Sequence, residues 1–204
     1  MLGEQLEKKF EAENMIGEVE LLALLKKYNV LVNEWGKGEA KTVWHLLSEI
    51  NSGEAELIEE NGELIRKVQG ATVNVYYTDG QKILKLKEKS QVFVDGRERV
   101  RELEASIGEK LKSNESPISA VQRALFEELN ITESLPFSKV SETKKGPVPS
   151  ISYPGIKTEY LTHVFEVILP FCFYKPEGYI EKQKDKETIF VWEGGFKFLI
   201  QQIC

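Results

Sequence analysis

The spacing of apolar residues predicts two helices near the start of the chain. Residues 17–27 carry a broad apolar stripe, as a helix packed along one side requires. The stripe consists of Val19, Leu21, Leu22, Leu24 and Leu25. Residues 42–50 repeat this pattern, with Thr42 as a suitable N-cap. Weaker helical patterns occur at 4–14 and 196–203.

After residue 51 the pattern changes to the alternation that is typical of strands. Asn61-Gly62, Asp79-Gly80 and Asp95-Gly96 separate apolar runs, and each pair is a strong hairpin signal. Gly108 is expected to open a loop that leads to a helix from Pro117 to Leu129, with Ser116 as the N-cap of that helix. More strand patterns follow it, at 137–143, 158–169 and 187–192.

This order of elements predicts an α+β fold with a mixed, largely antiparallel sheet. Residues 1–69 are expected to form a small N-terminal extension of helices and a hairpin that packs on the core. Residues 70–204 are expected to form the main domain. No internal repeat interrupts this division.

Net charge, apolar runs and cysteine spacing indicate which binding partners and which cellular compartment are compatible with the sequence. The formal net charge of −6 argues against a nucleic-acid or anionic-membrane partner, because both require a basic face. No apolar run reaches the roughly 20 residues of a membrane-spanning helix. Cys172 and Cys204 have no metal-ligand spacing, so we expect free thiols in a reducing compartment. The sequence therefore favours a cytoplasmic protein, with a plastid or another organelle as the alternative.

The helix at 117–129 carries the strongest candidate chemistry. Glu127 and Glu128 are adjacent, and Arg123 lies one turn before Glu127. Hard divalent cations prefer clustered carboxylate oxygens, so this face is a candidate metal site. The alternative is a solvated helix face on which Arg123 and Glu127 form an ordinary surface pair. The opposite face is apolar and predicts packing on a sheet; it consists of Ile118, Val121, Leu125 and Leu129.

Residues 108–131 resemble the Nudix box, whose pattern is G-x5-E-x7-R-E-U-x-E-E-x-G-U with U apolar. The matching positions are Gly108, Glu115, Arg123, Leu125, Glu127, Glu128 and Ile131. The resemblance covers roughly residues 70–193 and implies an α/β/α sandwich. It also implies Mg²⁺- or Mn²⁺-dependent hydrolysis of a nucleoside diphosphate linked to another group. Glu115, Glu127 and Glu128 would bind the metal, and Arg123 would orient the glutamates.

Three positions depart from the family pattern. Six residues, not five, separate Gly108 from Glu115. Asn130 stands where the family has glycine, but asparagine tolerates the left-handed backbone that ends a helix. Ala124 stands where the family has a glutamate that binds metal or orients a base, and alanine can do neither.

Other residues are weaker candidates for the site. Glu181 is the favoured replacement carboxylate, in a loop that also offers Glu177 and Asp185; a solvated loop is the alternative. Arg99 and Lys110 are candidate phosphate ligands, against a solvated strand face and a solvated loop.

An aromatic residue completes this set. Tyr153 lies beside a Pro-Gly turn, where its ring is a candidate for stacking on a base, against ordinary packing of the loop.

The sequence thus supports a Nudix-like hydrolase with a nucleotide-like substrate as the main hypothesis. One alternative is a Nudix-fold domain of weak or no activity that binds a ligand or a protein. Another is an interaction protein whose helix 17–27 docks a partner or a second copy, so a homodimer is possible.

Overall fold

The computed structural model describes residues 16–194. The helices are α2 (Glu18–Lys27), α3 (Val43–Asn51) and α4 (Pro117–Leu129), with short 3-10 turns η1 (Val32–Glu34) and η2 (Phe171–Phe173). The strands are β1 (Glu56–Glu60), β2 (Glu63–Thr78), β3 (Ile83–Phe93), β4 (Glu98–Arg99), β5 (Ile107–Lys110), β6 (Phe137–Pro149), β7 (Lys157–Ile168), β8 (Tyr179–Lys182) and β9 (Lys186–Gly194). The weak helical patterns at 4–14 and 196–203 lie outside the described residues.

The chain divides into two compact units. Among the described residues, unit 1 comprises 16–69, 111–114 and 144–161, and unit 2 comprises 70–110, 115–143 and 162–194. The long strands β2, β6 and β7 contribute residues to both units. The boundary expected at residues 69 and 70 between an extension and a main domain stays a prediction.

Unit 1 is built on the two predicted N-terminal helices. Thr42 caps α3, since its hydroxyl accepts from the His45 N–H at 3.4 Å. The core of the unit gathers apolar side chains from α2, α3, β2 and the loop 150–156; its buried members are Leu21, Leu25, Val30, Trp35, Leu46, Leu47, Leu64, Tyr153 and Ile156. The Trp35 indole N–H donates to the Pro154 carbonyl at 2.9 Å, which ties this loop to the N-terminal helices.

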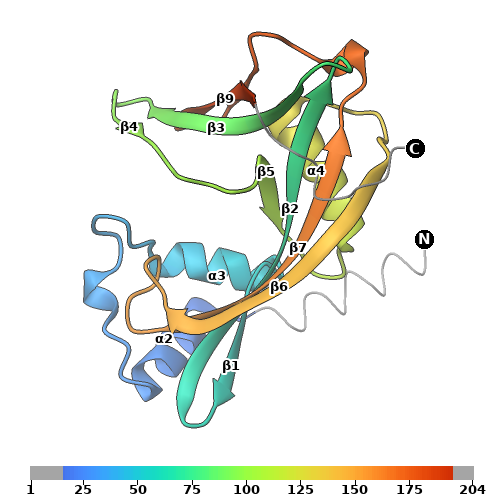
Figure 1. Cartoon of the computed structure of the whole chain (residues 1–204). Coiled ribbons are helices and arrows are strands. Elements are labelled where there is room, and N and C mark those ends of the chain that lie inside the picture. The colour runs from blue at the N-terminus through green and yellow to red at the C-terminus, as the bar shows by residue number, and fades with distance from the viewer. Residues whose placement is uncertain (1–15, 195–204) are drawn as a thin grey trace, which may run out of the picture. The chain divides into compact units, whose positions relative to one another are not determined.

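In unit 2 the strands belong to a sheet whose main order is β6-β7-β2-β3-β9-β8 (Figure 1). Strand β5 pairs with β2, and β4 pairs with β3. The β2–β3, β2–β5, β3–β4, β3–β9 and β8–β9 pairings are antiparallel. The predicted α+β class with a largely antiparallel sheet is confirmed. The open sheet and the three described α-helices are consistent with a Nudix-like sandwich.

Two local predictions around the sheet are wrong. The strand expected after Asp95-Gly96 is only two residues long in β4, so Arg101 lies in the segment that follows it. Gly108, expected to open a loop, lies inside β5, where it pairs with Thr72. A side chain at residue 108 would come within 3.0 Å of Thr72, which explains why a residue without Cβ occupies this position.

No helix in the part of the chain that the structure describes is long and apolar enough to cross a membrane.

Candidate functional site

Helix α4 begins and ends where the sequence predicts, but Ile118, predicted on its buried apolar face, is 53% exposed. Ser116 caps its N-terminus by accepting from the Ser119 N–H at 3.1 Å, and Pro117 occupies the first turn. Asn130 ends it in the left-handed conformation, with φ of 55°. One face of the helix is buried and consists of Ala120, Val121, Ala124, Leu125 and Leu129. The other face carries Arg123 and Glu127.

Arg123 joins α4 to the segment that precedes it. Its Nε and Nη2 atoms each donate to a Glu115 oxygen at 2.9 Å, and Nη1 donates to Glu109 at 2.9 Å. Nη2 also reaches the Lys110 carbonyl at 2.7 Å. Glu127 lies 3.6 Å from Nη1, with a 43% exposed side chain. The hydrogen bonds that Arg123 donates to Glu115 raise the pKa of Arg123, and Glu109 raises it further, whereas burial acts in the opposite direction. The guanidinium therefore fixes the geometry of this segment.

Ala124, the departure from the family pattern, is fully buried, with 0% of its surface exposed. It lies on the face of α4 that packs into unit 2, between Val121 and Leu125. A glutamate built at this position would start inside the protein, where an unpaired carboxylate is strongly disfavoured.

Glu128 lies in the most unusual electrostatic environment of the segment. Its Oε1 accepts from the Gly108 N–H of β5 at 3.1 Å. Burial is the largest effect and raises the pKa of Glu128 to about 8, while the Gly108 hydrogen bond acts in the opposite direction. The neighbouring Glu181, Glu109 and Glu88 raise the pKa further. Glu128 therefore belongs to a group of carboxylates with an excess of negative charge.

One member of this surrounding, Glu88, was missed in the sequence. Glu88 is on β3 with a 2% exposed side chain, and both its oxygens accept from Arg101, through Nε at 2.8 Å and through Nη2. A signal for Glu88 existed, because it continues the alternation of Leu84 and Leu86 along β3 and therefore falls on a face that should be apolar. Nothing in the sequence marked Arg101 as distinct from the neighbouring arginines.

A row of side chains crosses the sheet next to this group. In the antiparallel pairings Glu181 lies opposite Thr188, Thr188 opposite Gln91, and Gln91 opposite Arg99. Opposed residues in antiparallel strands share a face of the sheet, so the row runs from the carboxylates to Arg99. Arg99 itself is exposed.

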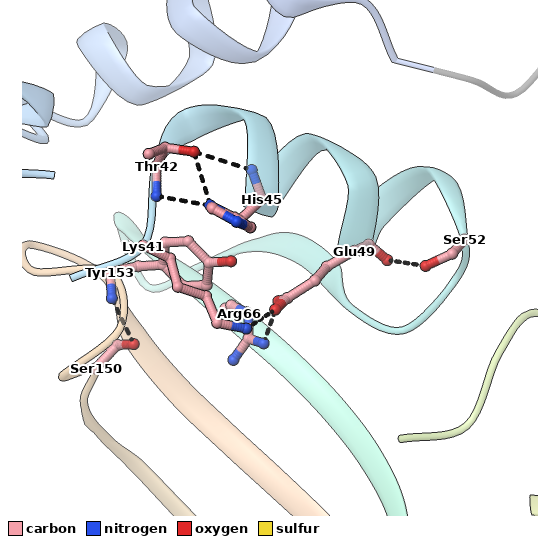
Figure 2. Close-up of polar contacts among 8 residues, drawn as sticks. All are labelled: Lys41, Thr42, His45, Glu49, Ser52, Arg66, Ser150 and Tyr153. Carbon is pink, nitrogen blue, oxygen red and sulfur yellow. Dashed lines mark hydrogen bonds and ion pairs between the residues drawn. The ribbon is translucent and has the colours of Figure 1, made fainter. Parts of the chain in front are cut away.

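The structure distributes the remaining predicted residues over different surroundings. Both Glu115 oxygens accept from Arg123, and the half-buried Lys110 contributes its carbonyl to the same guanidinium. Tyr153 lies in unit 1 and is 0% exposed; its ring is 5.1 Å from the Arg66 guanidinium and 5.2 Å from the Trp35 ring. Figure 2 shows Tyr153 among the polar residues of unit 1.

The predicted metal ligands are not gathered into a single closed set. Glu115 and Glu127 interact with Arg123, whereas Glu128 interacts with Gly108. Among residues 16–194, no three or more His, Cys, Asp or Glu side chains are arranged as a group that could hold a metal ion.

No protein family and no curated protein matches the sequence. Solved structures do match. The NUDIX domain of Shewanella oneidensis NrtR, complexed with ADP ribose, has 10% identity over 62% of this chain and 71% of that chain, with a TM-score of 0.40. A MutT/nudix family protein from Enterococcus faecalis has 13% identity over 79% and 54%, with a TM-score of 0.41. The E. coli dihydroneopterin triphosphate pyrophosphohydrolase has 14% identity over 61% and 78%, with a TM-score of 0.37.

The chain is structurally similar to Nudix proteins. The TM-scores are all below 0.5, so what this chain does has to be inferred from its own site residues.

Proposed function

We propose that this chain is a Nudix-type protein that binds a divalent cation together with a nucleoside diphosphate linked to another group, and hydrolyses the diphosphate slowly. The observation that carries the proposal is the position of Glu128. Its carboxylate is held by the Gly108 N–H and lies near Glu88, Glu109 and Glu181; burial, reinforced by these neighbouring carboxylates, raises its pKa to about 8.

Mg²⁺ or Mn²⁺ fits the chemistry of this donor set. A carboxylate that is protonated because of burial and neighbouring carboxylates becomes a good ligand when a cation supplies positive charge. Glu128 and Glu181 would hold the cation, with Glu127 at the exposed edge. Mg²⁺ is usually bound by one or two carboxylates and by the phosphates of the substrate, so Glu128 and Glu181 would suffice as the protein ligands.

The chain's own residues would have separate roles. When bound, the cation would offset charge on the phosphoryl oxygens during attack by water. Arg123 holds β5, Glu115 and α4 in register, so that Glu128 stays next to Gly108. Without the cation Glu128 holds a proton at neutral pH, and it would release this proton on ligating the cation. Ala124 can neither ligate nor take a proton, and for this reason we propose slow turnover.

A second candidate function is ligand binding without turnover. The specific observation that favours it is the complete burial of Ala124. The position of the missing glutamate is filled by packing, so no other side chain is brought to that point of α4.

Purified protein separates the two functions. Mn²⁺ binding is measured by electron paramagnetic resonance for the wild type, for Glu128→Gln and for the exposed control Glu133→Gln. Product release is then measured with Mg²⁺ and with Mn²⁺ on nucleoside diphosphates that carry sugar, nucleoside or alkyl groups. We expect Glu128→Gln to weaken Mn²⁺ binding at least tenfold and the control to bind as the wild type does.

Slow turnover that Glu128→Gln abolishes supports the hydrolase. Mn²⁺-dependent ligand binding with no product supports the binding domain. Unchanged Mn²⁺ affinity in Glu128→Gln contradicts the proposed site for both functions.

A further inference from the structure

Arg101 brings a positive charge into the carboxylate group around Glu128. Its Nε donates to Glu88 Oε1 at 2.8 Å, and its Nη2 donates to Glu88 Oε2. Glu88 has a 2% exposed side chain, whereas that of Arg101 is 33% exposed. The guanidinium is therefore anchored at its inner side by a buried carboxylate and reaches solvent at its outer side.

A second contact fixes the inner side. The side-chain amide of Gln91, a residue that is 2% exposed, lies 3.0 Å from both Arg101 Nη2 and Lys186 Nζ. Because both of these groups are donors, the amide oxygen is assigned to the side that faces them. Gln91 thus accepts from the side chains of Arg101 and Lys186. Because glutamine is neutral, it adds no negative charge to the carboxylates around Glu128.

The segment that carries Arg101 is itself attached to β3. Lys85 Nζ donates to the Glu104 carbonyl at 2.7 Å, and Lys87 Nζ donates to the Leu103 carbonyl at 2.7 Å. These bonds fix the backbone that follows Arg101, so its placement beside Glu88 is part of the fold of unit 2.

Arg101 also lies within electrostatic reach of the proposed cation ligands. Glu88 is the largest cause of the raised pKa of Arg101, and Glu128 and Glu181 raise it further, whereas burial acts in the opposite direction. Glu88 from β3 contacts the guanidinium directly, and Gln91, with Lys186 from β9 beyond it, connects the guanidinium to the row that leads through Thr188 to Glu181 on β8. Glu128 from α4 adds negative charge to the same surrounding.

We propose that Arg101 is a built-in counter-ion that weakens the binding of a free divalent cation at Glu128 and Glu181, so that the cation binds tightly only together with a phosphate group. The inference rests on the proposed function. A cation that enters alone would be repelled by the fixed guanidinium, because like charges in a partly buried site interact more strongly than they do in water. A phosphate brings negative charge that offsets both cations, and the outer N–H groups of Arg101 suit phosphate oxygens.

The test uses Mn²⁺ and inorganic phosphate as probes, with binding measured by electron paramagnetic resonance. Arg101→Gln removes the charge, and Arg101→Lys keeps it. Arg97→Gln is the matched control, because Arg97 is an exposed arginine of the same hairpin that pairs with Asp95. We expect Arg101→Gln to bind Mn²⁺ alone at least tenfold more tightly than the wild type, and Arg101→Lys and Arg97→Gln to change it less than threefold.

Phosphate supplies the second readout. It should tighten Mn²⁺ binding at least tenfold in the wild type, after correction for Mn²⁺–phosphate complexes in a protein-free sample, and much less in Arg101→Gln. Equal or weaker Mn²⁺ binding by folded Arg101→Gln overturns the inference. If Arg101→Gln does not fold, because Glu88 is left unpaired, the wild-type phosphate effect decides, and its absence overturns the inference.

The two proposals fail in different ways. If Glu128→Gln keeps the wild-type Mn²⁺ affinity, the proposed cation site is wrong. If Glu128→Gln loses Mn²⁺ but Arg101→Gln does not gain affinity, the site is right and the role of Arg101 is wrong.

Discussion

Arg123 donates to both carboxylate oxygens of Glu115, from Nε and from Nη2, and both distances are 2.9 Å. Both side chains are mostly covered, with 17% and 13% of their surfaces exposed. The pair joins the middle of α4 to the segment before the helix, and Glu109 extends it to β5. This part of the box is therefore a structural clamp that remains intact although Ala124 replaces the adjacent glutamate.

Arg123→Lys should destabilise the protein. Lysine cannot form two parallel hydrogen bonds with Glu115, so the carboxylate loses one of the two bonds that Arg123 donates to it in a partly buried site. We expect the free energy of unfolding to fall by about 1–3 kcal/mol, less than for a fully buried pair. Urea unfolding measures the change. The exposed Arg97–Asp95 pair provides the control, since Arg97→Lys should change stability by less than about 0.5 kcal/mol. Equal effects of the two substitutions would show that the clamp contributes nothing.

Ala124→Glu restores the family residue in sequence but should not restore it in function. Ala124 is 0% exposed, so the new carboxylate would enter the interior beside Val121 and Leu125. We expect a loss of about 2–4 kcal/mol in the free energy of unfolding. The exposed Gln122→Glu on the same helix should stay within about 0.5 kcal/mol. A stable Ala124→Glu protein with faster Mn²⁺-dependent turnover would contradict this interpretation of the site.

Local signals in the sequence predicted much of the frame of the site. Ser116, Pro117 and Asn130 bound α4 as predicted, because capping depends on residues within one or two turns. Asp79-Gly80 likewise joins β2 to β3, since a hairpin brings together neighbours in the chain.

The contents of the site depend on contacts that are distant in sequence. Arg101 reaches Glu88 because a hairpin returns the chain beside β3, and the sequence did not show where that strand would end. The buried position of Tyr153 could not be predicted for the same reason. Its loop is fixed by a hydrogen bond between Trp35 and Pro154, which are 119 residues apart. Propensity and motif spacing describe neither kind of contact.

The stability of the protein should decrease with pH through the titration of Glu128. Burial raises the pKa of Glu128 from 4.5 to about 8, so the folded protein holds this proton more tightly than the unfolded chain does. From about pH 5 to about pH 8 the unfolded chain has lost the proton that the folded protein retains, and the free energy of unfolding therefore falls as pH rises. The loss is fully developed only above the pKa of the folded protein.

Glu128→Gln tests this prediction, because glutamine cannot titrate. The fall in stability from about pH 5 to about pH 8 should be smaller in the variant than in the wild type, by on the order of 1–3 kcal/mol. Urea unfolding across this range without divalent metal gives the measurement, and Glu133→Gln is the exposed control. Parallel pH profiles of the wild type and Glu128→Gln would rule out a raised pKa at this residue.

In unit 1, Glu49 neutralises the buried Arg66. Among the single substitutions proposed here, replacement of Glu49 should lower the free energy of unfolding the most. Glu49 accepts from Arg66 Nη2 at 2.5 Å and from Lys41 Nζ at 2.7 Å (Figure 2). The side chains of Glu49 and Arg66 are only 6% and 4% exposed. Glu49→Gln leaves the Arg66 charge without its counter-ion in the interior, and we expect the free energy of unfolding to fall by about 3–5 kcal/mol.

The exposed pair between Lys27 and Glu59, with side chains 58% and 49% exposed, is the control for this change. Glu59→Gln should cost less than about 1 kcal/mol, since water already screens that pair. Replacing both buried partners, Glu49→Leu with Arg66→Met, should recover much of the loss, because an apolar pair of similar size avoids an unpaired buried charge. A double variant as unstable as Glu49→Gln would show that packing around these side chains, and not the stranded charge of Arg66, accounts for the effect.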